Sequence, residues 1–160
     1  KYLPSMSLEP TSAMCLFLND GNTLEKSWNE PMYDLKNMEF TPTFWGAFDN
    51  TKLIGVNSGH MTLNRLYRSR GLFVFPEYRG FAIGQKLLMK TIAQAIHEKA
   101  IVCWSYPKKT AERSYHSQHF QSRGHSFNFQ YEGDNIRAVK IFDERGLVDC
   151  LNPKIKKQLP

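Results

Sequence analysis

Long apolar runs and paired cysteines are both missing from this chain, and each absence argues against a class of protein. No stretch approaches the roughly 18 consecutive apolar residues that a membrane-spanning helix needs. Residues 1–5 carry one lysine with no apolar run behind it, unlike a secretory signal. Cys15, Cys103 and Cys150 are far apart and form no C-x-x-C pair, so neither a disulfide framework nor a cysteine zinc site is expected. We expect a soluble protein of the reducing cytoplasm, with no membrane partner.

Positive charge is in excess. The chain has 21 Lys and Arg against 15 Asp and Glu, a net charge of +6. This balance suits an anionic partner such as a phosphorylated cofactor or a nucleic acid. No helix-turn-helix or aromatic RNA-binding signature accompanies it, so a nucleic-acid partner is disfavoured.

The chain is expected to form a single domain over residues 1–160, because it shows no internal repeat and no low-complexity linker. Residues 1–11, which contain two prolines, are predicted to be an extended lead-in. Residues 146–160 are predicted to be a C-terminal tail, either solvated or packed on a partner subunit, which leaves a homodimer open.

Hydrophobic periodicity predicts a sheet whose later strands alternate with helices. Helical spacing predicts a helix over 82–96 and another over 110–123 that ends at Gly124. One or two short helices fit 23–38. Strands are predicted at 14–18, 43–48, 53–61, 67–75, 101–104, 125–132 and 136–143. This order predicts an α/β (α+β) fold, with a mixed sheet and helices on its faces.

The clearest chemical signal lies in residues 72–88, which read as a strand, a proline, a turn of small residues and an amphipathic helix. The first N–H groups of such a helix, with the positive end of its dipole, favour a phosphate. Arg79 can add a charge-assisted contact. A dinucleotide-binding loop is not supported, since G-x-G-x-x-G is missing, and a P-loop is excluded because no Gly-Lys-Ser/Thr follows.

This segment resembles the GCN5-related N-acetyltransferase (GNAT) superfamily. The family signature Q/R-x-x-G-x-G/A follows a strand that ends V-x-P, and here Arg79-Gly80-Phe81-Ala82-Ile83-Gly84 follows Leu72-x-Val74-x-Pro76. Ala82 replaces the first family glycine. Phe120-Gln121-Ser122-Arg123-Gly124 resembles the family's Y-x-x-x-G-F, which ends the helix after the fifth strand. In element order the resemblance covers residues 43–143. It implies a mostly antiparallel sheet in which the strands carrying Leu72 and Cys103, the central pair, splay apart.

The resemblance also implies acetyl-coenzyme A (acetyl-CoA) as cosubstrate and no metal. Backbone groups of the strand at Leu72, Phe73 and Val74 would pair with the pantetheine arm. The residues implied to hold the pyrophosphate are those of the turn and helix start: Arg79, Gly80, Phe81, Ala82, Ile83, Gly84 and Gln85.

Catalytic residues are harder to assign. The family tyrosine that protonates the departing thiolate corresponds to Phe120 in this reading, and the carboxylate base of some members corresponds to Arg68. The remaining candidates are Ser117, Tyr115, His60 and Ser105, each of which also has a purely structural interpretation. Trp28 and Tyr33 either shape an acceptor pocket or close the core.

The function that follows is transfer of an acetyl group from acetyl-CoA to a primary amine by direct nucleophilic attack. The alternative is a non-catalytic acyl-CoA-binding module, suggested by Phe120 and Arg68. The amine acceptor is not identified by the sequence.

Overall fold

The computed structural model describes residues 3–11, 40–129 and 133–151. The predicted strand 14–18, the predicted helices within 23–38, and Trp28 and Tyr33 lie outside these residues. Within them, no helix is long and apolar enough to cross a membrane.

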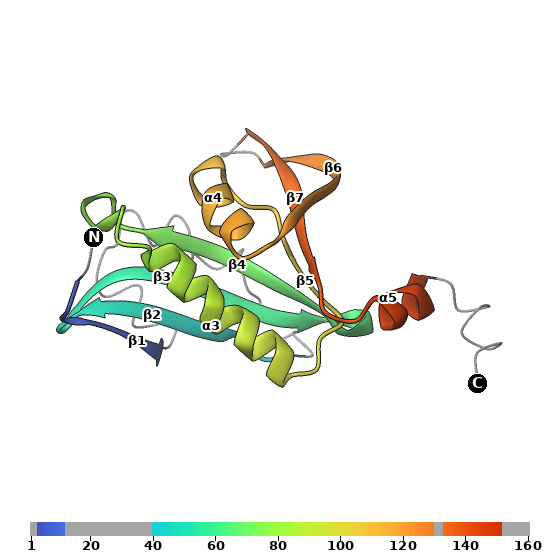
Figure 1. The fold of residues 1–160 in the computed structure, drawn as a ribbon, viewed down its shortest axis with the longest axis horizontal. Coiled ribbons are helices and arrows are strands. Elements are labelled where there is room, and N and C mark those ends of the chain that lie inside the picture. The colour runs from blue at the N-terminus through green and yellow to red at the C-terminus, as the bar shows by residue number, and fades with distance from the viewer. Residues whose placement is uncertain (1–2, 12–39, 130–132, 152–160) are drawn as a thin grey trace.

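A seven-stranded sheet forms the body of the molecule, in the order β1-β2-β3-β4-β5-β7-β6 (Figure 1). Every neighbouring pair is antiparallel except β4 and β5, which are parallel. This confirms the mixed, mostly antiparallel sheet. The strands are β1 (Met6–Thr11), β2 (Thr43–Asp49), β3 (Lys52–Thr62), β4 (Leu66–Val74), β5 (Val102–Ser105), β6 (Gln121–Phe129) and β7 (Gly133–Ile141).

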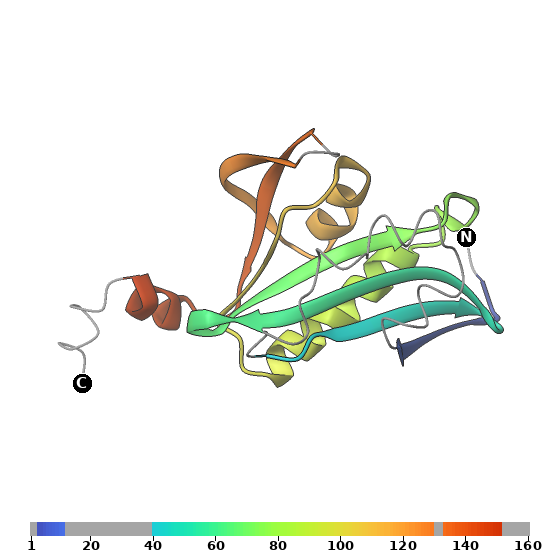
Figure 2. The same ribbon diagram turned by 180° about the vertical axis from the view of Figure 1, so that it is seen from behind.

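Helix α3 (Ile83–His97) covers one face of the sheet, and Figure 2 shows the sheet from the other side. Its apolar residues recur three or four positions apart, which places Leu87, Leu88 and Ile92 on one buried stripe. Helix α4 (Lys109–Ser117) packs on the same face, next to α3. Helices on the opposite face remain a prediction, because the segment expected to supply them is not among the described residues.

Three boundaries differ from those expected. Residues 6–11 of the predicted lead-in form the edge strand β1, which pairs with β2. Part of the predicted tail lies in helix α5 (Glu144–Leu151). The helix predicted over 110–123 already ends at Ser117, and Gly124 lies instead within β6, at an irregularity of the β6–β7 pairing.

The early end of α4 has a local cause. His119 takes a left-handed conformation with φ of 65°, and the Phe120 N–H then bonds to the Tyr115 carbonyl at 3.1 Å. A left-handed residue followed by such a backward hydrogen bond is a common way for a helix to end. Histidine is one of the residues that tolerate this conformation. The sequence interpretation was wrong here because it relied on glycine as the stop signal.

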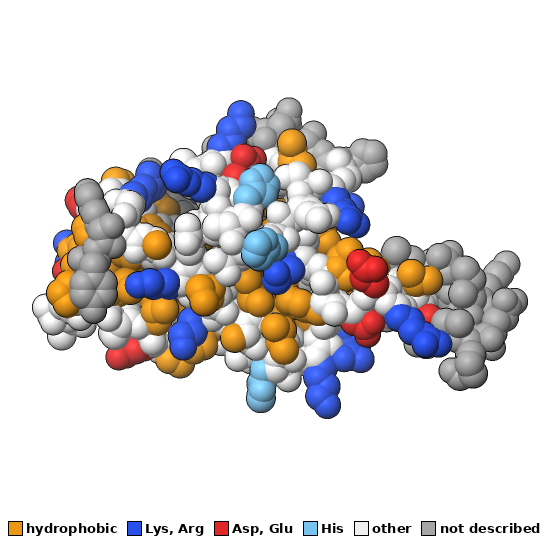
Figure 3. Space-filling view, viewed as in Figure 1, with side chains coloured by type: hydrophobic (Ala, Val, Ile, Leu, Met, Phe, Trp, Pro, Cys, Tyr) orange, Lys and Arg blue, Asp and Glu red, His pale blue; other side chains and the backbone are white. Residues whose placement is uncertain are grey.

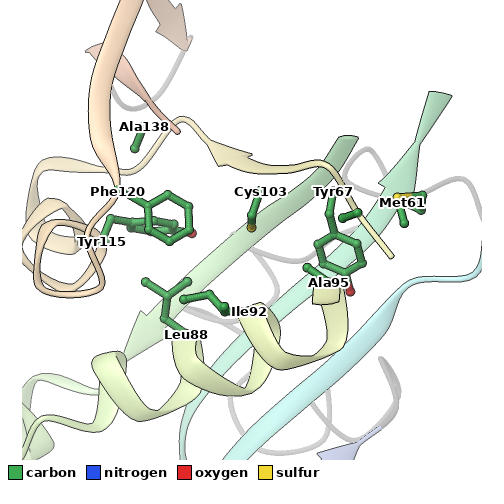
Figure 4. Packing of buried hydrophobic residues seen from close by; sticks show 11 residues of the cluster. Met61, Tyr67, Leu88, Ile92, Ala95, Cys103, Tyr115, Phe120 and Ala138 are labelled. Atoms are coloured by element: carbon green, nitrogen blue, oxygen red, sulfur yellow. The ribbon is translucent and has the colours of Figure 1, made fainter. Parts of the chain in front are cut away.

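Where α4 meets α3 and the middle of the sheet, the buried residues form one apolar cluster (Figure 4). Tyr115 and Phe120, from the end of α4, point toward Leu88 and Ile92 of α3. Their two rings meet edge to face, with centroids 5.0 Å apart. Cys103 of β5 is also fully buried in this cluster. The end of α4 is therefore held firmly against α3 and the middle of the sheet.

Candidate functional site

The site begins where β4 and β5 part. The two strands pair only at Leu66↔Val102, Tyr67↔Cys103 and Arg68↔Trp104, while β4 runs on to Val74. Beyond Arg68, the β4 edge that faces β5 therefore has no pairing with it. Such an edge presents backbone N–H and C=O groups that an extended ligand can pair with. The splayed central strand pair that the resemblance implied is confirmed.

A pocket of about 550 Å³ lies beside this open edge, within the range usual for small-molecule sites. All of the predicted cofactor-binding residues line it except Phe81. Sequence reasoning missed Tyr78 and a second group of lining residues. This group consists of Lys108, which precedes α4, and four residues of α4: Thr110, Ala111, Arg113 and Ser114. No local motif marks that group, because only the packing of α4 beside α3 brings it to the pocket.

The turn before α3 is shaped to expose backbone. Gly80 has φ of 91°, and a Cβ at that position would meet nothing within 4 Å. Ala82, the N-cap of α3, has φ of 58° and makes no side-chain cap hydrogen bond. The first N–H groups of α3 have no acceptor within the helix, so they are available to an anion in the pocket. Ala82 takes the left-handed conformation that glycine adopts more easily, which accounts for the glycine usual at this place in the family.

Positive side chains surround this helix start. Arg79, Lys108 and Arg113 line the pocket, and none of its described lining residues is acidic. Figure 3 shows basic side chains gathered over this part of the molecule. Arg79 is held in place, since its Nε donates to the Val74 carbonyl at 3.1 Å and its guanidinium lies over the Phe73 ring. The pocket therefore combines oriented N–H groups with fixed positive charge, the combination that binds phosphates.

Three hydroxyl groups lie at the point where the strands part. Ser69 is the first β4 residue beyond the last β4–β5 pair, and Ser105 follows that pair on β5. Both side chains are buried, on the sheet face covered by α3. The Tyr115 hydroxyl reaches the same place from α4 and lies 2.7 Å from Ser69 Oγ. Tyr115 shares its cluster with Leu72 and Ala111, which line the pocket.

The observed end of α4 corrects the placing of the family pattern Y-x-x-x-G-F. With the helix ending at Ser117, the pattern fits Tyr115-His116-Ser117-Gln118-His119-Phe120, five residues before the segment chosen from the sequence. His119 supplies the left-handed conformation at the glycine position. Phe120 then corresponds to the family phenylalanine and Tyr115 to the tyrosine. The signal that could have found this is the Tyr–Phe spacing, read without requiring the glycine.

The other candidates lie elsewhere. Ser117 is exposed, and its hydroxyl donates to the Ser114 carbonyl at 2.6 Å. His60 lies on β3 opposite Arg68, on the sheet face away from α3. Burial, with the charges of Arg68 and Arg70, lowers the pKa of His60 to about 4. His60 is therefore neutral at pH 7 and a weak base. Burial raises the pKa of the Cys103 thiol to about 12, so it stays protonated and is not a nucleophile.

The pKa of His60 predicts how stability depends on pH. Between pH 6.5 and about 4 the unfolded chain takes up a proton on this histidine that the folded chain does not, so stability falls as the pH falls through this range. His60→Gln is expected to lose less stability between pH 7 and pH 5 than the unaltered protein in urea unfolding. His97→Gln, at an exposed position on α3, is the control. An equal loss in His60→Gln and the unaltered protein would contradict the assignment.

Comparison with known proteins agrees with this geometry. The sequence model of the Acetyltransferase (GNAT) family matches residues 13–127. A comparison with curated protein sequences gave no significant match.

Several solved structures share the fold at low sequence identity. IAA acetyltransferase from Bacillus cereus is 16% identical with a TM-score of 0.67, over 86% of this chain and 100% of its own. An acetyltransferase of the GNAT family from Staphylococcus aureus is 16% identical with a TM-score of 0.62, over 86% and 99%. PaiA N-acetyltransferase from Thermoplasma acidophilum, in complex with coenzyme A, is 15% identical with a TM-score of 0.59, over 86% and 99%.

Proposed function

Since the chain belongs to the acetyltransferase (GNAT) family, we propose that it transfers an acetyl group from acetyl-CoA to a primary amine by direct attack. The observation that carries this proposal is the pocket between the open edge of β4 and the start of α3. It offers backbone pairing, helix N–H groups and positive charge along one continuous surface. A phosphorylated, extended thioester needs all three.

The described residues fit coenzyme A by position. The backbone of Leu72 and Val74, on the edge of β4 that β5 leaves open, pairs with the amide groups of the pantetheine arm, while the backbone carbonyl of Phe73 between them faces β3. The N–H groups at residues 80–85, with Arg79, hold the pyrophosphate. Lys108 and Arg113 contribute further positive charge from the opposite wall.

Tyr115 is the proton donor in this proposal. Acetyl-CoA supplies an activated acyl group on a thioester sulfur. The attacking amine forms the N–C bond as the C–S bond breaks, and Tyr115 gives its hydroxyl proton to the departing sulfur. The amine loses its own proton to solvent, and a proton from solvent restores the Tyr115 hydroxyl. Support comes from the position of the Tyr115 hydroxyl where β4 and β5 part and from the end of α4, which fits the family pattern to Tyr115.

A non-catalytic acyl-CoA-binding module remains the second candidate. Phe120, one of the two residues that suggested it, is no longer at the tyrosine position. Arg68, where some family members carry a carboxylate base, still favours it. Turnover separates the two candidates.

The test of the proposed function is thiol release from acetyl-CoA with a panel of lysine peptides, polyamines, aminoglycosides and amino acids. The expected result is release that depends on one class of amine, with the acetylated amine found by mass spectrometry. Binding of coenzyme A without release across the panel would select the non-catalytic module. Absence of both would reject the assignment of the pocket.

A further inference from the structure

Four buried polar side chains form a hydrogen-bonded network that crosses the core beside the pocket and joins four elements of the fold. Asn57 of β3 donates from Nδ2 to Ser69 Oγ of β4 at 3.1 Å and to Thr91 Oγ1 of α3 at 2.8 Å. Ser69 Oγ then lies 2.7 Å from the Tyr115 hydroxyl of α4. All four side chains are nearly inaccessible to solvent, between 0% and 1% exposed.

Most hydrogens of this hydrogen-bonded network can be placed by counting donors and acceptors. The two Nδ2 hydrogens of Asn57 are both used, one on each hydroxyl. Thr91 gives its own hydrogen to the Leu87 carbonyl at 3.4 Å. Ser69 accepts from Asn57 and keeps one hydrogen of its own, and at 2.7 Å either Ser69 or Tyr115 can donate to the other. Once Tyr115 has given up its own proton, Ser69 is the partner in this contact that still has a hydrogen to donate to the tyrosine oxygen.

We propose that Ser69, oriented by Asn57, is a positioning residue for proton donation by Tyr115; this inference rests on the proposed function. When Tyr115 gives up its proton, negative charge develops on its oxygen inside the core. A buried charge of this kind is costly unless a donor already points at it. Ser69 supplies that donor, and its own acceptor bond from Asn57 strengthens the donation.

The position of this hydrogen-bonded network fits a role in positioning Tyr115 better than a role in packing alone. Ser69 is the first residue of the β4 edge that β5 leaves open, so it lies where the two strands part. Thr91 takes the other Nδ2 hydrogen of Asn57, so Asn57 and Ser69 stand between it and Tyr115 in this set of hydrogen bonds.

The experiment compares Ser69→Ala with Thr91→Ala. Each variant removes one buried hydroxyl bonded to Asn57 Nδ2, but only the first removes the hydroxyl that is hydrogen-bonded to Tyr115. With acetyl-CoA and the most active amine of the panel, Ser69→Ala is expected to lower kcat about 10-fold and to leave KM for acetyl-CoA within about 2-fold. Thr91→Ala is expected to lower the unfolding midpoint to a similar degree while kcat stays within about 2-fold.

A second measurement ties the effect to the tyrosine. In the Tyr115→Phe background, Ser69→Ala is expected to lower kcat no further, because the tyrosine oxygen that the Ser69 hydroxyl serves is already absent. The inference would be overturned if Ser69→Ala and Thr91→Ala lost kcat equally. It would also be overturned if Ser69→Ala lowered kcat as much in the Tyr115→Phe background as in the unaltered protein, because either result would mean that these hydrogen bonds serve folding alone.

The outcomes separate this inference from the proposed function. A Ser69→Ala variant with normal kcat, beside a Tyr115→Phe variant with low kcat, overturns the positioning role and leaves the proposed function intact. A Tyr115→Phe variant with normal kcat rejects Tyr115 as proton donor, and the positioning role with it, while acetyl transfer stands. An unaltered protein without turnover rejects both.

Discussion

Gly84→Asp is expected to weaken coenzyme A binding by at least about 100-fold in isothermal titration calorimetry. A Cβ at this position would lie 2.8 Å from Ser114 Oγ of α4, which also lines the pocket. The carboxylate would also bring negative charge to the helix start that is proposed to hold the pyrophosphate. The contact with Ser114 and the added carboxylate are both expected to weaken binding of coenzyme A, the carboxylate by repelling phosphate.

The matched control is Met89→Asp, which places the same carboxylate on the same helix at an exposed position outside the pocket. Its affinity for coenzyme A is expected to stay within about 3-fold of the unaltered protein. Circular dichroism confirms that both variants are folded. Normal affinity in Gly84→Asp would mean that the phosphates bind elsewhere.

Tyr115→Phe is expected to lower kcat about 100-fold, the contribution usual for a positioned general acid, and to leave coenzyme A affinity unchanged. The ring that packs on Phe120 is kept, so the change removes the hydroxyl and little else. Steady-state kinetics with acetyl-CoA and titration with coenzyme A measure the two quantities separately.

Ser117→Ala is the control for this experiment, because Ser117 was an equal candidate in the sequence. Its hydroxyl is exposed and bonded to a carbonyl of its own helix, so kcat is expected to be unchanged. If Ser117→Ala lost activity and Tyr115→Phe kept it, the roles given to the two residues would be reversed.

Local patterns were enough to predict the turn that the pocket is built around. The apolar strand ending at Val74, the proline and the helical spacing after Ala82 are all contiguous in sequence. Strand and helix bounds in this region agree with the structure to within one or two residues. The resemblance added the splay between β4 and β5, which no local pattern contains.

The proposed catalytic end of the site depends on contacts between distant segments. The buried hydrogen-bonded network joins four elements through Asn57, Ser69, Thr91 and Tyr115. Nothing in any one of these segments marks its polar side chain as part of the network. The end of α4 was missed for a different reason. A left-handed histidine ends this helix where glycine is the usual residue, so the helix was predicted to end six residues too late.

The claim that the backbone of the β4–α3 segment holds the cofactor is tested most directly by amide hydrogen exchange with and without coenzyme A. The account predicts slower exchange on ligand addition in residues 72–74 and 80–85, larger than anywhere else in the described chain. Unchanged exchange in these residues, at coenzyme A concentrations that saturate binding, would contradict it.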